Sequence, residues 1–208
     1  MGCDIHTHFE FKRTYNNEKK WYCGDYFTLN HYFKEDDPEY GEKYELVQVF
    51  KERNYSIFAT LANVRNYGDT PYISQPKGLP HDVTAETKKD SDYWGCDGHS
   101  HSYLTLRELL DFRDSAPPLK HRGMISPDAQ KALDEEGKKP EMWCQGTNQA
   151  GWDWREWEEP NWALDELIEA MKRRAAELHL IYEFTWEREP EKAYEQANDV
   201  RLVFWFDN

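Results

Sequence analysis

Residues 4–12 alternate between two kinds of side chain. One set is mostly apolar and consists of Ile5, Thr7, Phe9 and Phe11. The other set is ionisable and consists of Asp4, His6, His8 and Glu10. Because successive side chains of a strand point to opposite faces, this segment predicts a β-strand with one apolar and one ionisable face. Such a strand belongs in a sheet with a core on one side, and its other face is the first candidate site.

The same segment contains one copy of a repeated motif. Residues 2–8 read Gly-Cys-Asp-Ile-His-Thr-His, and residues 95–101 read Gly-Cys-Asp-Gly-His-Ser-His. Carboxylate, imidazole and thiolate groups all bind cations, and two histidines two apart on an extended chain point the same way. We therefore expect the two copies to meet in space and to build one metal or polar catalytic site.

The metal hypothesis gives each residue of the motifs a role. The expected metal ligands are His6, His8, His99, His101 and Asp4. Imidazole combined with carboxylate suits zinc, manganese or iron. Such a metal lowers the pKa of a bound water, and Glu10 or Asp97 would accept its proton. In the alternative, the histidines only hydrogen-bond to each other. Cys3 and Cys96 would be ligands or nucleophiles, or buried inert thiols, which we favour.

Four basic residues stand near expected helix ends or a loop rich in Gly and Pro. They are Arg53, Arg65, Lys77 and Arg107. In the functional interpretation they clamp the phosphates of a small ligand, and in the alternative they neutralise neighbouring carboxylates. The tryptophan-rich segment 143–162 has a similar pair of interpretations. Its rings either stack on a base or sugar, or anchor a long ordered loop to the core.

The composition bounds the class of protein. The 208 residues fit a single domain spanning residues 1–208, and 15% aromatic residues with 9 Trp supply enough apolar area for a core. A net charge of −14 argues against bulk nucleic-acid binding and is compatible with a basic protein partner. Four scattered cysteines do not make a disulfide scaffold. With no apolar stretch of membrane-spanning length and no signal-peptide pattern, we expect a cytoplasmic protein.

The remaining patterns predict an α+β fold. Helices are expected at residues 55–64, from Thr105 to Pro117, between Ser126 and Gly137, and after Asn161 as a cap, with a helical turn at 84–89. Strands are expected at residues 44–50, 182–186 and 200–206, and an aromatic strand or packed loop at 21–27. Because 200–206 is almost entirely apolar, we place it centrally in a mixed or antiparallel sheet that contains both termini, with helices packed on it. The second motif copy would lie on a loop leading into a helix.

The motifs resemble two known patterns. Residues 1–6, 53–66, 77–80, 94–110 and 200–208 resemble an uncharacterised family of bacterial and phage proteins that open with Met-Gly-Cys-Asp-Ile-His, which implies a prokaryotic or phage origin. Residues 4–8 are also similar to the Asp-x-His-x-His metal motif of the PHP and amidohydrolase phosphoesterases, and residues 97–99 to their closing Asp-x-His. This local resemblance implies metal chemistry. It does not extend to the fold, because the chain has too few strands for a barrel.

Three functional hypotheses follow. The first is a metal-dependent hydrolase that acts on a small phosphoester or nucleotide-like substrate. The second is a non-catalytic phage or bacterial binding protein that sequesters a nucleotide signal or blocks a defence protein. The third is a structural module that uses the same residues to hold zinc without an open coordination position.

Overall fold

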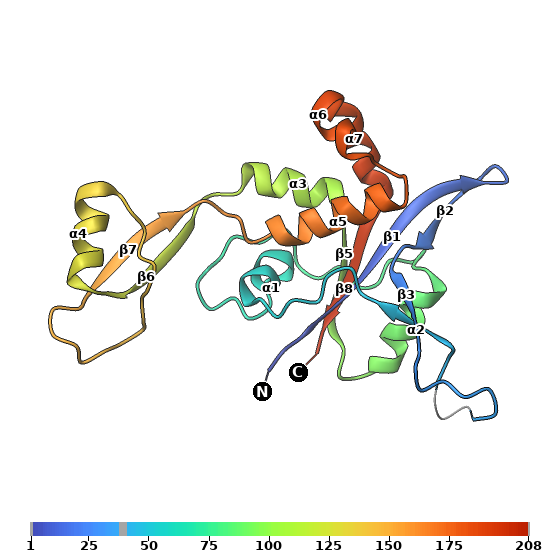
Figure 1. Ribbon diagram of the computed structural model, residues 1–208, viewed down its shortest axis with the longest axis horizontal. Coiled ribbons are helices and arrows are strands. Elements are labelled where there is room, and N and C mark those ends of the chain that lie inside the picture. The colour runs from blue at the N-terminus through green and yellow to red at the C-terminus, as the bar shows by residue number, and fades with distance from the viewer. Residues whose placement is uncertain (1, 38–40, 208) are drawn as a thin grey trace.

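A four-stranded antiparallel sheet forms the centre of the computed structural model, which describes residues 2–37 and 41–207 (Figure 1). The strand order is β2-β1-β8-β5. The strands are β1 Ile5–Tyr15, β2 Glu18–Cys23, β5 His99–Thr105 and β8 Val200–Phe206. The first and last strands of the chain are neighbours, and β8 lies between β1 and β5. The predicted α+β fold, with both termini in one sheet and an apolar central closing strand, is confirmed.

The pairing of β1 with β8 assigns each side chain to a face. Ile5 lies opposite Phe206, and Thr7 lies opposite Phe204, so the apolar sets of the two strands share one face. His6 lies opposite Trp205 and Glu10 opposite Arg201 on the other face. All seven residues of β8 are buried, which means that both faces of the sheet are covered.

Three helices cover the apolar face and make the main core. They are α1 Tyr55–Ala62, α3 Leu106–Ser115 and α5 Asp165–Glu177. Asn54 caps α1, and Thr105 forms the expected capping box with Glu108 at the start of α3. These caps satisfy backbone N–H groups that the first turn of a helix leaves unpaired. The expected cap of α5 is wrong, because that helix begins after Leu164 without a side-chain cap.

The second face is covered by α2 Ala85–Trp94 and by the segment that leads into it. The expected helical turn at 84–89 is therefore the first half of a longer helix, capped by Thr84. A two-stranded sheet of β3 Tyr26–Leu29 and β4 Tyr44–Val47 lies beside α2 (Figure 1). The apolar residues that mark other helices are scarce in α2, which explains why its length escaped the sequence pattern.

A lobe at the left of Figure 1 contains β6 Leu119–Ile125, α4 Pro127–Glu136 and β7 Asp153–Glu159. The helix between Ser126 and Gly137 is confirmed. The long loop expected at 143–162 is wrong in part, because residues 153–159 pair with β6 as an antiparallel hairpin. Seven-residue β6 was not expected from its mixed polar and apolar sequence.

The last helices follow α5 closely. They are α6 Glu183–Arg188, α7 Pro190–Gln196 and the 3-10 helix η2 Ala197–Asp199. The strand expected at 182–186 is wrong, since this segment forms α6 against α5 and α7. The alternation of aromatic residues there has a different basis: Tyr182 and Phe184 stack on each other at the surface, with ring centroids 5.4 Å apart. Among the described residues, no helix is long and apolar enough to cross a membrane.

Candidate functional site

The ionisable face of β1 is a buried polar layer between the sheet and α2. His6, His8 and Glu10 point toward the helix, and all three are buried. The facing side of α2 presents a stripe with helical spacing that consists of Thr87, Asp90, Ser91 and Trp94. Each member of this stripe contacts a different residue of the sheet. Each residue of this stripe on α2 therefore has its own contact partner on the polar face of the sheet.

His8 is held between two carboxylates. Its Nδ1 lies 2.7 Å from Oδ2 of Asp25, and its Nε2 lies 3.0 Å from Oδ2 of Asp90. Burial alone would lower the pKa of His8, but the hydrogen bonds to Asp25 and Asp90 outweigh it and raise that pKa to about 9. Oδ1 of Asp25 accepts the amide N–H of Phe9 at 2.8 Å. His8 is consequently an imidazolium at neutral pH, fixed from both sides.

The two motif copies meet around one indole. Trp205, at the middle of the sheet, stacks with His6, His8 and His101 at ring-centroid distances of 5.6, 5.1 and 5.5 Å. Since β8 separates β1 from β5, imidazoles from the two copies approach the same indole from opposite sides. Three of the four motif histidines thus share one environment, with an indole at its centre.

The fourth histidine lies on the other face because β5 contains a bulge. His99 pairs with Phe206 and Ser102 with Phe204, so two residues oppose Trp205 alone. Ser100 takes a left-handed conformation with φ 54° to form this bulge. His99 therefore shares the face of Phe206, whereas His101 faces Trp205. The expectation that the two histidines of this copy point the same way is wrong, and so is the loop expected for residues 99–101.

Glu10, expected as a general base, is instead fully engaged. Its Oε1 accepts hydrogen bonds from the amide and hydroxyl of Thr84 at 2.9 and 2.7 Å and from the hydroxyl of Thr87 at 2.8 Å. Its Oε2 lies 2.8 and 2.7 Å from Nε and Nη2 of Arg201. Arg201 also donates to Asp82 and lies over the ring of Trp21. Buried and saturated in this way, Glu10 acts as the anchor of an ion-pair network.

Asp4 and Asp97, the other acids of the motifs, lie outside the polar layer. The carboxylate of Asp4 pairs with Arg53, which lowers the pKa of that carboxyl. The backbone N–H of Asp4 donates to Oδ1 of Asp207 at 2.8 Å, and Oδ2 of Asp207 lies 3.1 Å from Nε2 of His6. Asp97 is exposed on the turn before β5. The partner of His6 is thus Asp207, which the sequence patterns did not single out.

The positions of the side chains that could coordinate a metal do not form a metal site among the described residues. Across residues 2–37 and 41–207, no group of three or more His, Cys, Asp and Glu side chains is arranged to hold a metal ion. His6 and His8 contact separate carboxylates, and His101 lies 3.0 Å from the hydroxyl of Ser91. Burial and the neighbouring His99 lower the pKa of His101, which favours its neutral form. Three of the expected ligands, His6, His8 and His101, are therefore brought near one another without converging on a point, whereas His99 and Asp4 lie apart from them.

The four expected phosphate-clamp residues are also dispersed. Arg53 pairs with Asp4, Nζ of Lys77 lies 3.0 Å from Glu108, and Nε of Arg107 lies 2.7 Å from Asp111. Arg65 contacts Cys3 and the hydroxyl of Tyr67. Each cation sits beside a local partner, as the alternative interpretation expected for three of them. Burial raises the pKa of the Cys3 thiol, which fits an inert cysteine, whereas Cys96 is exposed.

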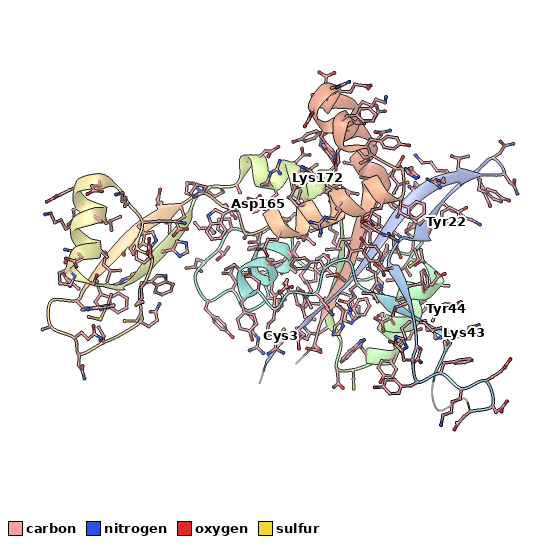
Figure 2. The ribbon with its side chains drawn as sticks, viewed as in Figure 1. Cys3, Tyr22, Lys43, Tyr44, Asp165 and Lys172 are labelled. Atoms are coloured by element: carbon pink, nitrogen blue, oxygen red, sulfur yellow. The ribbon has the colours of Figure 1, made fainter. Side chains whose placement is uncertain are left out.

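A cleft opens directly above His6 and His8. It has a volume of about 770 Å³ and lies between α2 and the β3–β4 segment. Asp90 and Trp94 line it beside the two histidines, and its outer walls carry the exposed rings of Phe27, Tyr44 and Tyr93. Tyr44 is labelled in Figure 2, on β4 beside α2. The polar layer thus reaches solvent in this cleft, where the side chain of Asp90 is one-third exposed.

Several residues of this site were not predicted. They are Asp25, Asp90, Ser91, Arg201, Trp205 and Asp207. Arg201 had a usable signal, because a single cation inside an otherwise apolar strand needs a buried partner. Asp25 and Asp90 had none, since a lone carboxylate beside a turn or in a polar helix resembles any surface acid.

Comparison of the chain with protein-family models, with curated proteins and with solved structures finds no match. The resemblances to the bacterial and phage family and to the phosphoesterase motif stay predictions.

Proposed function

We propose that the protein is a non-catalytic binding protein whose cleft above His8 takes a small organic cation bearing an ammonium or guanidinium group. The single observation that carries this proposal is the cleft itself, in which a fixed carboxylate, that of Asp90, lies among aromatic rings. A cation meets both of its preferred partners there, since carboxylates pair with it and ring faces attract it.

The charge of the cleft supports a cation over a phosphate. Among the described residues, four carboxylates line it, those of Glu42, Glu45, Glu86 and Asp90. Against them stand Lys89, which pairs with Glu42, and the imidazolium of His8, which is already shared between two carboxylates. A phosphate would meet a surplus of negative charge in a protein whose net charge is −14. This preference revises the small phosphate-containing ligand expected from the sequence.

The buried layer supports binding without turnover. Asp90 is oriented by His8, which is oriented in turn by Asp25, so the carboxylate is preorganised before a ligand arrives. The same contacts leave His8 no free nitrogen to act as a base, and Glu10 is saturated by five donor contacts. The side chains around the cleft therefore suit recognition better than proton transfer.

A metal-dependent hydrolase is the second candidate. The observation that favours it is that His6 and His8 line one cleft, each with its Nε2 beside a carboxylate. Zinc, manganese or iron would have to replace those hydrogen bonds with coordination. Elemental analysis of protein purified without added metal tests this candidate, together with turnover of generic phosphodiester substrates and its loss in chelator.

Calorimetric titration tests the cation proposal. The probes are arginine amide and spermidine as cations, and ATP as the anionic alternative, at about 0.15 M salt so that nonspecific attraction is screened. We expect the cations to bind and ATP not to bind. Asp90→Asn should weaken cation binding by about ten- to a hundredfold, as expected when a hydrogen-bonded charge is removed.

Asp92→Asn is the matched control. Asp92 is on the same helix and pairs with Lys88 at the surface, so this variant changes the net charge equally and leaves the cleft intact. Equal weakening by both variants would mean that the cations bind only to the general negative field. Binding of ATP in place of the cations would contradict the proposal directly.

A further inference from the structure

A second cavity lies far from the cleft, between the body and the lobe of β6, α4 and β7. It has a volume of about 1170 Å³, and one wall is residues 67–71 with Ser56. The other wall follows one edge of β6, from Leu119 to Arg122, with Trp143 and Trp154 nearby. Lys120, His121 and Arg122 line this groove, and the only carboxylate side chain among its described lining residues is Asp69. The lining of this groove therefore carries more positive than negative charge, together with aromatic rings, in a protein whose net charge is −14.

The edge of β6 that faces the groove is unpaired. Met124 and Cys144 exchange both backbone hydrogen bonds, at 2.9 and 3.1 Å, on the side of β6 away from β7. Because backbone groups of a strand alternate in direction, those of Arg122 and Lys120 point to the same outer side. Within residues 2–37 and 41–207 these backbone groups make no hydrogen bond. Cys144 therefore pairs with this edge of β6 at Met124, and the edge is open from Arg122 to Lys120.

The side chains around this edge alternate between two surfaces. Lys120 and Arg122 share one face of the hairpin with Trp154, and both cationic side chains are exposed. Each lies across from a glutamate of β7, at 4.0 Å from Glu158 and 3.8 Å from Glu156, so a strand added at the open edge would approach the two cations from the other side. His121 and Trp143 lie on the opposite face, where Trp143 packs against the backbone of β6. This close approach requires Gly123, since a Cβ there would lie 2.6 Å from the Trp143 ring. An added strand would meet cations with one set of side chains and aromatic rings with the other.

We infer that the open edge of β6 binds an extended, acidic segment of a partner protein as an added antiparallel strand. Backbone hydrogen bonds to Lys120 and Arg122 would supply affinity, as in other cases of strand addition to a sheet edge. Alternate carboxylates of the segment would pair with the two cations, and its apolar residues would contact Trp143. The interaction is independent of the cation proposed for the cleft above His8.

A second copy of this chain fits the edge poorly. Symmetric antiparallel pairing of β6 with itself would bring Lys120 and Arg122 of the two copies against one another. Like charges directly opposite in a sheet destabilise the pair. A nucleotide would use the tryptophans and cations but would leave the backbone groups of the edge without partners. Charge and hydrogen bonding therefore both favour an acidic peptide.

Titration with end-blocked peptides tests the inference. The probes are a peptide that alternates Val and Glu, the same peptide with Lys for Glu, and the Val-Glu peptide with N-methyl groups on alternate amides. We expect the acidic peptide to bind at least about tenfold more tightly than the other two, since one loses charge pairing and the other loses backbone hydrogen bonds. Hydrogen exchange at residues 119–122 should slow only with the acidic peptide.

Two variants separate the backbone from the charge. Arg122→Ala removes the cation, and Arg122→Pro removes the cation together with the outward N–H, which β6–β7 pairing does not use. Arg122→Pro should bind the acidic peptide about tenfold more weakly than Arg122→Ala. Thermal unfolding of both variants checks that the lobe stays folded, and the N-methylated peptide gives the same test on the unchanged protein.

Several results would overturn the inference. These are equal binding by the two variants, equal binding of the plain and N-methylated peptides, no preference for the acidic peptide, or absence of binding by all three probes. Tryptophan quenching by an oligothymidylate without peptide binding would assign the groove to nucleic acid instead. Concentration-dependent dimerisation that Arg122→Pro abolishes would assign it to a second copy.

Discussion

The two faces of the central sheet are both buried, yet they are filled by opposite chemistry. On one face Phe9, Leu202 and Phe204 pack against helices α1, α3 and α5 in the hydrophobic core. On the other face Glu10 and Arg201 form an ion pair beneath α2, next to histidines held by carboxylates. The same strands carry both faces: β1 alternates between apolar and ionisable residues, and β8 adds Arg201 and Trp205 to the polar face.

This difference teaches how each face holds its covering helices. Apolar packing depends on volume, so related side chains can substitute for one another at modest cost. A buried ion pair depends on every partner, because removing one leaves the other charged and unsolvated. The polar face therefore contributes less net stability per buried side chain but fixes α2 in one position. That fixed position is what builds the cleft above His8.

The largest expected effect comes from breaking the ion pair on the polar face. Glu10→Ala leaves Arg201 buried, with Asp82 as its remaining carboxylate partner. We expect the free energy of unfolding to fall by about 3–5 kcal/mol, the range for removing one member of a buried pair. Urea unfolding followed by circular dichroism measures the change.

A double variant sharpens this prediction. Glu10→Leu combined with Arg201→Met replaces the pair by apolar groups, and it should recover most of the stability that Glu10→Ala loses. Lys19→Ala serves as the control, since its ion pair with Asp199 is exposed and should contribute at most about 1 kcal/mol. A loss in the double variant as large as in Glu10→Ala would show that the two faces do not differ in this way.

The next effect is a dependence of stability on pH that belongs to His8. Its pKa is about 9 in the folded protein against 6.5 as the reference value. The stabilisation is therefore complete below pH 6.5 and is lost as the pH rises through 9. The difference corresponds to about 3 kcal/mol, measured as the decline in the free energy of unfolding between about pH 6 and about pH 10.

The control for this prediction is a histidine that faces solvent. His8→Gln should be less stable than the unchanged protein at about pH 6 and should lack this decline, whereas His31→Gln, at an exposed position, should keep it. A decline that persists in His8→Gln would move the titrating group elsewhere. The ion pair of Glu10 with Arg201 would then be the one remaining test of the difference between the two faces of the sheet.

The same contrast accounts for how much of the fold and site the sequence could predict. The apolar face was predictable because period-two alternation in β1 and the apolar run of β8 are each typical of a strand and of little else. The helical spacing of apolar residues located α1, and capping residues located α3 and α4 in the same direct way. On the polar face only the β1 side was predictable. The helix that completes it, α2, has a polar inner stripe, so hydrophobic periodicity could not indicate where it packs.

The bulge in β5 is the clearest limit of sequence-based prediction in the site. The repeat of the motif implied that His99 and His101 would mirror His6 and His8. Whether a strand carries an extra residue depends on its register with its neighbour, and the motif itself does not encode that register. A glycine would have signalled a left-handed position there, but the chain has Ser100.

Ser100 provides the smallest expected effect and tests this last point. A β-branched residue is strained at φ 54°, so Ser100→Val should lower the free energy of unfolding by about 1–2 kcal/mol. Ser100→Gly should be neutral or slightly stabilising, because glycine adopts this conformation freely even though the contact between Ser100 Oγ and His99 Nδ1 is lost. Denaturant midpoints of the two variants measure the difference.

If Val and Gly were tolerated equally, β5 would pair without the bulge in solution, and His99 would join His101 on the face of Trp205. The polar layer would then contain all four motif histidines, and His99 would belong to the polar face and not to the apolar face.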